Sequence, residues 1–156
     1  MIEIDIPGFG KLDLRNLVCD FNGTLAQDGA LQDGARTRLP RFRDRLRLHI
    51  VTGDTFGTAR AELEGVDCEV IVLPAEGQAE AKACYITSLG ASHVVAIGNG
   101  RNDRLMLAGS ALGIGVCGGE GIAAETIAAS DVVVENIGAA LDLLLETKRL
   151  VASLRD

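Results

Sequence analysis

Short, wholly apolar runs alternate with longer stretches of helical periodicity along most of the chain. The apolar runs contain few polar residues, which is typical of strands that are buried on both faces of a sheet. We predict six strands, over Leu17–Phe21, Leu48–Thr52, Glu69–Leu73, His93–Gly98, Ala111–Cys117 and Asp131–Val134. The other stretches predict helices near Asp33–Leu46, Gly57–Leu63, Gln78–Leu89, Arg101–Ala108, Ile122–Ala128 and Ile137–Leu154. This order predicts a doubly wound, Rossmann-like α/β fold, with a mostly parallel sheet and helices on both faces.

The first 15 residues follow a different pattern, in which apolar and polar residues alternate one by one. The alternation runs over 2–6 and 12–14, and the turn sequence Pro7-Gly8-Phe9-Gly10 lies between. It predicts a β-hairpin at the edge of the fold. No linker or repeat divides the remainder, so residues 1–156 are expected to form one domain.

Composition narrows the class of protein. Hydrophobic residues make up 47% of the 156 residues and charged residues 24%, which excludes a disordered or fibrous chain. The net charge of −7 argues against nucleic acid as a partner. The longest uncharged run, 105–119, is too short and too rich in glycine to span a membrane. The acidic first residues and four cysteines without a C-x-x-C pair are typical of a cytoplasmic protein with free thiols.

Three polar turns follow predicted strands. Strand 17–21 leads into Asp20-Phe21-Asn22-Gly23-Thr24, and strand 48–52 ends in Thr52-Gly53-Asp54-Thr55. Strand 93–98 continues as Gly98-Asn99-Gly100-Arg101-Asn102-Asp103, and Lys82 lies on the helix before that strand. Because ligands bind beyond the carboxyl ends of parallel strands, we expect these turns to form one site.

The residue types in these turns suit phosphoryl transfer. Asp20 at a strand end is a candidate nucleophile, and the Gly23-Thr24 turn can donate backbone N–H groups to phosphate. The Thr52 hydroxyl is a further donor, and Lys82 is a positive charge for the phosphate. Turn 98–103 offers the oxygen ligands that Mg²⁺ prefers.

Four motifs, carried by Asp20–Thr24, Thr52, Lys82 and Gly98–Asp103, occur in the order found in the haloacid dehalogenase-like (HAD) phosphohydrolase superfamily. The chain from about residue 17 to its end resembles this superfamily, and its second half resembles the small soluble P-type ATPase-like phosphatases. The resemblance implies an Mg²⁺-dependent hydrolase that forms an aspartyl-phosphate from a small phosphorylated substrate. It also implies roles for single residues. The catalytic residues would be Asp20, Asn22, Thr52 and Lys82, the phosphate-binding residues Gly23, Thr24, Gly53 and Asn102, and the metal ligands Asp20, the Asn22 carbonyl, Asn99 and Asp103.

Two positions depart from the superfamily pattern, in which aspartate usually stands where this chain has Asn22 and Asn99. An amide cannot carry a proton between leaving group and water, and it offers a metal a neutral oxygen. We therefore expect slow turnover through Asp20. The alternative is a catalytically degenerate module that binds phosphate or regulates a partner.

The chain leaves no room for a cap domain. The gaps between Asp20 and Thr52 and between Thr52 and Lys82 are too short for one, and Leu25–Leu31 fits a short flap. Because capless relatives often complete their sites with a neighbouring subunit, we expect a homo-oligomer.

Other features have simpler explanations. Asp54-Thr55 fits a substrate contact or a helix N-cap equally well. Gly113–Gly118 spells G-x-G-x-x-G, but its first two glycines lie inside a predicted strand, which favours close packing. The arginines of Arg36–Arg47 fit the solvent-exposed face of an amphipathic helix with a kink at its proline. His49 and His93 begin strands, at the end of the sheet away from the predicted site.

Overall fold

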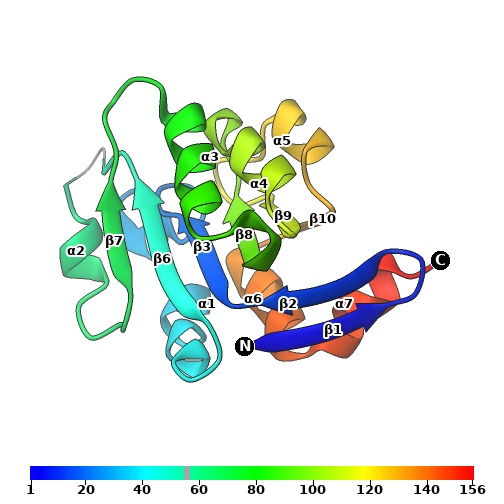
Figure 1. The fold of residues 1–156 in the computed structure, drawn as a ribbon. Helices are drawn as coiled ribbons and strands as arrows, with labels where there is room; N and C mark the ends of the chain where they lie inside the picture. The colour runs from blue at the N-terminus through cyan, green and yellow to red at the C-terminus, as the bar shows by residue number, and fades with distance from the viewer. Residues whose placement is uncertain (55–56) are drawn as a thin grey trace.

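The computed structural model describes residues 1–54 and 57–156, and its centre is a six-stranded parallel sheet (Figure 1). All six predicted strands are present, with ends that differ by at most one residue. They are β3 (Asn16–Asp20), β6 (Arg47–Thr52), β7 (Glu69–Val72), β8 (Val94–Gly98), β9 (Leu112–Val116) and β10 (Val132–Val134). The strand order is β10-β9-β8-β3-β6-β7, and every neighbouring pair is parallel. The predicted doubly wound α/β fold is confirmed.

The order of the strands reverses at β3. From β3 the chain proceeds to β6 and β7 on one side and then crosses to β8, β9 and β10 on the other. Such a reversal opens a crevice at the carboxyl ends of the strands, where the connections on either side leave in opposite directions. In this sheet the switch point lies between the carboxyl ends of the neighbouring strands β3 and β8.

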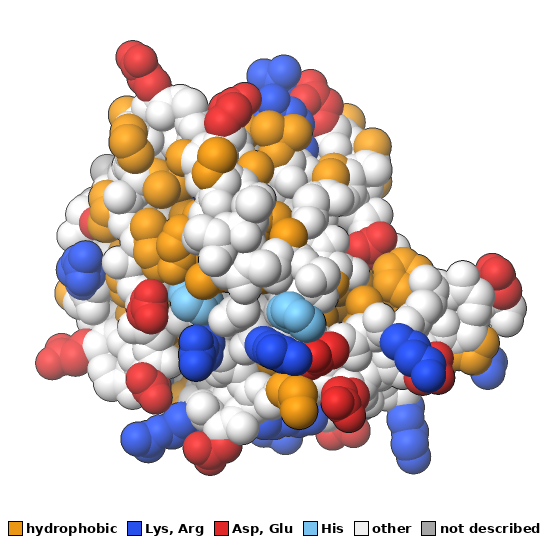
Figure 2. All heavy atoms as spheres, in the orientation of Figure 1, with side chains coloured by type: hydrophobic (Ala, Val, Ile, Leu, Met, Phe, Trp, Pro, Cys, Tyr) orange, Lys and Arg blue, Asp and Glu red, His pale blue; other side chains and the backbone are white. Residues whose placement is uncertain are grey.

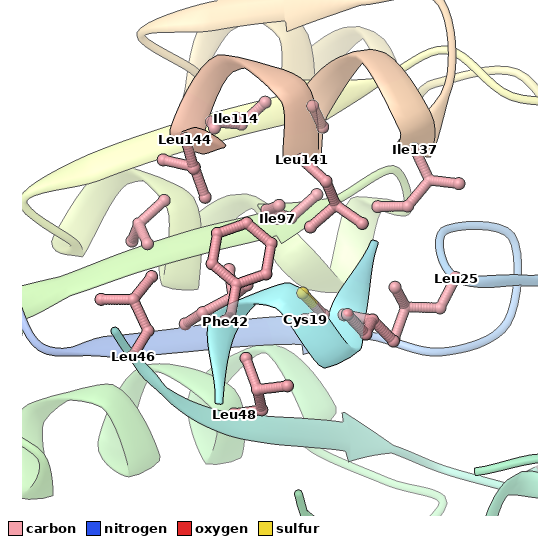
Figure 3. Packing of buried hydrophobic residues seen from close by; sticks show 14 of the residues in the cluster. Cys19, Leu25, Phe42, Leu46, Leu48, Ile97, Ile114, Ile137, Leu141 and Leu144 are labelled. Atoms are coloured by element: carbon pink, nitrogen blue, oxygen red, sulfur yellow. The ribbon is translucent and has the colours of Figure 1, made fainter. Parts of the chain in front are cut away.

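Helices cover both faces of the sheet because successive strand residues point in opposite directions. Val18 of β3 joins a cluster with residues of α3 (Gln78–Ser88) and α4 (Arg104–Gly109). Its neighbour Cys19 joins a larger cluster on the other face, with α6 (Ile137–Leu145). Figure 3 shows the α6 side chains of this second cluster directed at the sheet. None of the helices that the structure describes is long and apolar enough to cross a membrane.

The prediction of one helix over Asp33–Leu46 is wrong. The structure has a single turn, α1 (Asp33–Arg36), followed by the 3-10 turn η1 (Leu39–Phe42). Pro40 lies at the start of η1, where its missing N–H costs nothing, whereas inside a long helix it would break the hydrogen-bond ladder. The segment is held by side chains instead, since Arg38 donates to both oxygens of Asp142 on α6, at 2.8 and 2.9 Å.

The remaining helices agree with the prediction in place, and α3 agrees closely in length. Of the others, α2 (Ala59–Glu62) and α5 (Ala124–Ala128) are shorter than predicted. The helix predicted over Arg101–Ala108 has the expected extent but divides into η3 (Arg101–Asp103) and α4. The pattern over 137–154 divides into α6 and α7 (Thr147–Leu154). The break falls at Glu146, whose backbone angles of −120° and 68° are not helical.

The predicted amino-terminal hairpin is present as β1 (Ile2–Ile6) and β2 (Gly10–Leu14). It forms a two-stranded sheet of its own, separate from the main sheet (Figure 1). Its buried isoleucines and leucines join the larger apolar cluster, with partly buried residues of α7. A second, very small hairpin, β4 (Ala26–Gln27) and β5 (Ala30–Leu31), lies within the predicted flap.

Candidate functional site

The three polar turns meet at one edge of the sheet, as the strand order requires. Asp20 is the last residue of β3, Thr52 the last of β6 and Gly98 the last of β8. Because β3 pairs with both β6 and β8, the three strand ends are neighbours. The site is therefore assembled from segments that are far apart in the chain.

Lys82 is buried at the centre of this edge, on α3, and its side chain has no exposed surface. Its Nζ donates to Asp20 Oδ1 at 2.7 Å and to Asp103 Oδ1 at 2.6 Å. We call these three residues the Lys82 network. Within it only Asp20 has exposed side-chain surface, 10%, against 0% for Asp103. Asp20 is thus the carboxylate that a ligand can reach.

Burial sets the protonation of the Lys82 network. Burial, together with the nearby charge of Asp103, raises the pKa of Asp20 to about 7, because the opposing charge of Lys82 offsets only part of it. Burial also acts to lower the pKa of Lys82, but the charges and hydrogen bonds of its two carboxylates outweigh it. The pKa of Lys82 is therefore raised, and the ammonium stays charged.

Asp103 holds the turn after β8 in shape. Its Oδ2 accepts hydrogen bonds from the backbone N–H groups of Asn99, at 3.0 Å, and Gly100, at 2.9 Å. Since its Oδ1 binds Lys82, both oxygens of this predicted metal ligand already have partners. A Cβ at Gly98 would come within 2.6 Å of the Asp103 carboxylate, so the approach of this side chain to the strand end depends on glycine.

The turn after β3 directs the remaining polar atoms toward Asn99. The Thr24 hydroxyl, which is fully buried, lies 3.3 Å from Asp20 Oδ2 and 3.1 Å from Asn99 Oδ1 and can donate to either. These two oxygens consequently face the same space. Asn22 Oδ1 is also buried, and within the described residues it has no hydrogen-bond partner.

The backbone amides that the sequence assigned to phosphate are used inside the turn. The N–H of Gly23 donates to the carbonyl of Ala26 at 2.8 Å, and that of Thr24 donates to the carbonyl of Phe21 at 3.3 Å. Gly23 has a φ of +83°, a conformation that favours glycine. The contribution of these two residues is to fix the turn and to place the Thr24 hydroxyl.

The turn after β6 faces the start of α3. Thr52 Oγ1 accepts from the N–H of Asp54 at 2.9 Å, so its own proton remains free to be donated. Asp54 Oδ1 accepts from the N–H of Ala59, the first residue of α2, at 3.1 Å, but the N-cap residue of this helix is Thr58 and not Asp54. Thr55 lies outside the described residues.

Sequence reasoning missed Gln78, which joins two of the turns. Its Oε1 accepts from Asn102 Nδ2 at 2.8 Å, and its amide group occupies the space that a Cβ at Gly53 would need. Gln78 precedes Lys82 by four residues, and this helical spacing, which places both on one face, was the available signal.

Sequence reasoning also missed Glu120, in the loop after β9. Its Oε2 lies 2.6 Å from the position that a Cβ of Gly23 would occupy. The signal was a further glycine-rich turn, Gly118-Gly119-Glu120-Gly121, which follows β9. The glycines before it pack closely, as predicted: a Cβ at Gly113, within β9, would come within 2.7 Å of the carbonyl oxygen of Leu107.

The opposite end of the sheet carries the histidines and a hollow of about 630 Å³. The hollow is lined by Arg15, Arg45, Arg47 and His93 among others and lies away from the Lys82 network. His49 is buried nearby, with Nδ1 2.9 Å from Tyr85 Oη and Nε2 3.3 Å from an Asn16 oxygen. Figure 2 shows this face, where the histidine side chains lie beside lysine and arginine side chains. Both histidines thus take part in hydrogen bonds at the end of the sheet that the sequence indicated, His93 through its Nδ1 with the carbonyl of Asp13.

Comparison with known proteins places this geometry in context. The chain is 54% identical over 63 residues to "Uncharacterized protein MJ0073" of Methanocaldococcus jannaschii, a match that spans 40% of this chain and 68% of that protein. No family model matches the chain.

Solved structures resemble nearly the whole chain. The 3-deoxy-D-manno-octulosonate 8-phosphate phosphatase of Moraxella catarrhalis, determined with magnesium, phosphate and KDO, aligns with a TM-score of 0.71 and 17% identity over 92% of this chain and 94% of that chain. The cobalt-bound deoxy-D-mannose-octulosonate 8-phosphate phosphatase of Haemophilus influenzae aligns with a TM-score of 0.71 and 13% identity over 88% of this chain and 90% of that chain. A putative HAD family hydrolase of Streptomyces avermitilis aligns with a TM-score of 0.65 and 17% identity over 85% of this chain and 89% of that chain. The chain therefore belongs to the same family as the Methanocaldococcus protein, and its fold is the capless haloacid dehalogenase-like fold.

Proposed function

We propose that this protein is an Mg²⁺-dependent phosphohydrolase in which Asp20 attacks the phosphorus of a small phosphorylated substrate. The observation that carries the proposal is the position of Asp20. It is the one partly exposed carboxylate of the Lys82 network, it lies at the switch point of the sheet, and a buried ammonium lies 2.7 Å from it. The structural neighbours that are phosphatases with this fold support the same reaction class.

The donors around Asp20 fit a magnesium ion. Asp20 Oδ2 and Asn99 Oδ1 both lie beside the Thr24 hydroxyl, and the carbonyl of Asn22 is the third oxygen we assign. In the described parts of the chain, no three aspartate, glutamate, histidine or cysteine side chains gather into a metal site. Mg²⁺ accepts neutral oxygens and keeps several waters, so such a site binds it weakly. When bound, the ion would neutralise negative charge on the phosphate.

Each residue of the site has its own role in the proposed reaction. The Asp20 oxygen forms a bond to phosphorus as the bond from phosphorus to the leaving oxygen breaks, and water later cleaves the acyl-phosphate to release phosphate. Lys82 and the Thr52 hydroxyl stabilise the charge that develops on the phosphoryl oxygens. We assign Asp103 to positioning Lys82 and the turn after β8, because both of its oxygens have protein partners.

Asn22 makes the proposed enzyme slow. Its amide can orient the leaving group or a water but has no proton to transfer between them. General acid–base catalysis is typically worth about 10²- to 10⁴-fold, so turnover is expected to fall by that order. The same residue favours a second candidate function, a module that binds phosphate and has lost turnover.

An acyl-phosphate trap tests the proposal. The protein is incubated with Mg²⁺ and labelled acetyl phosphate, and base-labile label is measured in wild type, Asp20→Asn and Asp44→Asn, an exposed aspartate of the hollow at the other end. We expect label in wild type and Asp44→Asn and none in Asp20→Asn. Full labelling of Asp20→Asn would contradict the assigned nucleophile. Label that forms but never turns over would favour the binding module.

We also propose that the protein is a P-type ATPase-like member of its fold group, cytoplasmic and homo-oligomeric. The resemblance of the second half of the chain supports the first assignment, and the four free cysteines are compatible with a reducing compartment. The flap is only a two-stranded hairpin, so closing the site over a substrate calls for a neighbouring subunit. A molar mass from light scattering that equals one chain at all concentrations would contradict the oligomer.

A further inference from the structure

The loop Cys117–Gly121 lies directly over Asn99. Asn99 Nδ2 donates to the carbonyl of Gly121 at 3.1 Å, and the N–H of Ala123 donates to the carbonyl of Asn99 at 3.0 Å. A further bond, from the N–H of Gly121 to the carbonyl of Gly118, closes the loop at 2.9 Å. These bonds fix the backbone on both sides of Glu120 relative to the turn after β8.

The Glu120 carboxylate consequently points toward the turn after β3. A Cβ at Gly23 would meet three atoms, Glu120 Oε2 at 2.6 Å and the two amide atoms of Asn99 at 2.8 and 2.9 Å. Glu120 and Asn99 therefore approach Gly23 from the same side. Within the described residues, no lysine or arginine forms an ion pair with Glu120, in contrast to Glu125 nearby, which pairs with Arg101 and Arg104.

We propose that Glu120 supplies the negative charge that Asn99 does not, and is the second carboxylate of the divalent-cation site beside Asp20. The inference rests on the metal site of the proposed function and adds to it a residue from outside the four motifs. In the same turn as Gly23, the buried Asn22 Oδ1 has no hydrogen-bond partner among the described residues, which is a further sign that a polar partner from outside the chain completes this turn.

The chemistry of Mg²⁺ permits this role for an exposed side chain. The ion keeps several waters, so a carboxylate one water away from it still contributes by charge and by hydrogen bonds to those waters. A unit negative charge a few ångströms from a divalent ion, in a water-like medium, changes affinity by about ten-fold. The charge would also compensate for the neutral oxygen of Asn99 without placing another carboxylate in the buried Lys82 network.

Isothermal titration with Mg²⁺ alone tests the inference in wild type, Glu120→Gln, Asn99→Asp and the double variant. The matched control is Glu125→Gln, the same change on a glutamate that has arginine partners. We expect about ten-fold weaker binding in Glu120→Gln and no change in Glu125→Gln. Affinity close to that of wild type is expected in the double variant, because the new aspartate restores the lost charge. Thermal melting of each variant shows whether the fold is intact.

The outcomes separate the inference from the proposed function. Equal Mg²⁺ affinity in wild type and Glu120→Gln overturns the role of Glu120 and leaves the Asp20 site standing. Equal losses in Glu120→Gln and Glu125→Gln indicate a general charge effect and also overturn it. Absence of Mg²⁺ binding in wild type and in Asn99→Asp contradicts the metal site itself.

Discussion

Replacing Lys82 by methionine tests whether the Lys82 network holds the candidate site together. Methionine retains an unbranched apolar stem and removes the ammonium, leaving Asp20 and Asp103 buried side by side without a counter-charge. Breaking a buried ion pair by removing one partner typically costs about 3–5 kcal/mol, mostly through the stranded charge. Since the side chains of Lys82 and Asp103 have no exposed surface, we expect the free energy of unfolding to fall by this full amount. For a domain of this size the melting temperature would fall by roughly 6–20 °C.

The stability that Lys82→Met loses relative to wild type should also depend on pH. Loss of the ammonium raises the pKa of Asp20 still further above its ordinary value of 3.8. A carboxyl whose folded-state pKa is raised contributes stability below its unfolded pKa, and this contribution is lost as the pH rises through the folded pKa. The deficit of Lys82→Met relative to wild type should therefore be larger at pH 8 than at pH 5.

Urea unfolding followed by circular dichroism measures both effects. Lys148→Met, which removes an exposed lysine on α7, is the control and should change stability little. Adding Asp103→Asn to Lys82→Met should recover part of the loss, because one stranded charge is removed. A cost below about 1 kcal/mol, or a deficit that is the same at both pH values, would refute the reasoning.

Three further changes have defined outcomes. Asn22→Asp should raise Mg²⁺-dependent phosphatase turnover by about 10- to 10³-fold, and the gain should vanish when Asp20→Asn is added; no gain in a folded protein would favour the binding module. Burial lowers the pKa of His49 below 6.5, so wild-type stability should decline as the pH falls below that value, and urea midpoints of His49→Gln should lack this decline. The hydrogen bond from Arg38 lowers the pKa of Asp142 below 3.8, so Asp142→Asn should be less stable than wild type at neutral pH. That difference should close as acid unfolding proceeds below pH 3.8, and a constant difference would contradict the ion pair.

The periodicity of the sequence predicted the sheet well because parallel strands buried on both faces must be apolar throughout. Helix lengths were predicted less well. The apolar residues of 33–46 fit a helical spacing, and Leu39 and Phe42 are indeed buried, but Pro40 makes a short 3-10 turn the better solution. The spacing of apolar residues along the chain indicates which residues face the core, but it does not show whether the backbone between them is helical.

The residues of the candidate site also differ in how well the sequence could place them. Asp20, Thr52 and turn 98–103 could be placed together from the sequence, because the carboxyl ends of parallel strands share one edge. Lys82 could be assigned only through its place among the motifs. A lysine on a helix is ordinarily exposed, and its burial depends on how α3 packs against the sheet.

The sequence by itself thus determined the strands, their connections by helices, and the edge of the sheet where chemistry-bearing residues gather. These follow from apolar periodicity and from the position of polar turns after strands. Only the tertiary structure decided that Asp103 binds Lys82 and the turn backbone with both oxygens, and that Gln78 joins Gly53 and Asn102. Only it brought Glu120 to the side of Asn99. The physical reason is that these contacts join segments from different strand ends, and their distances depend on packing and loop closure, which no local pattern in the chain records.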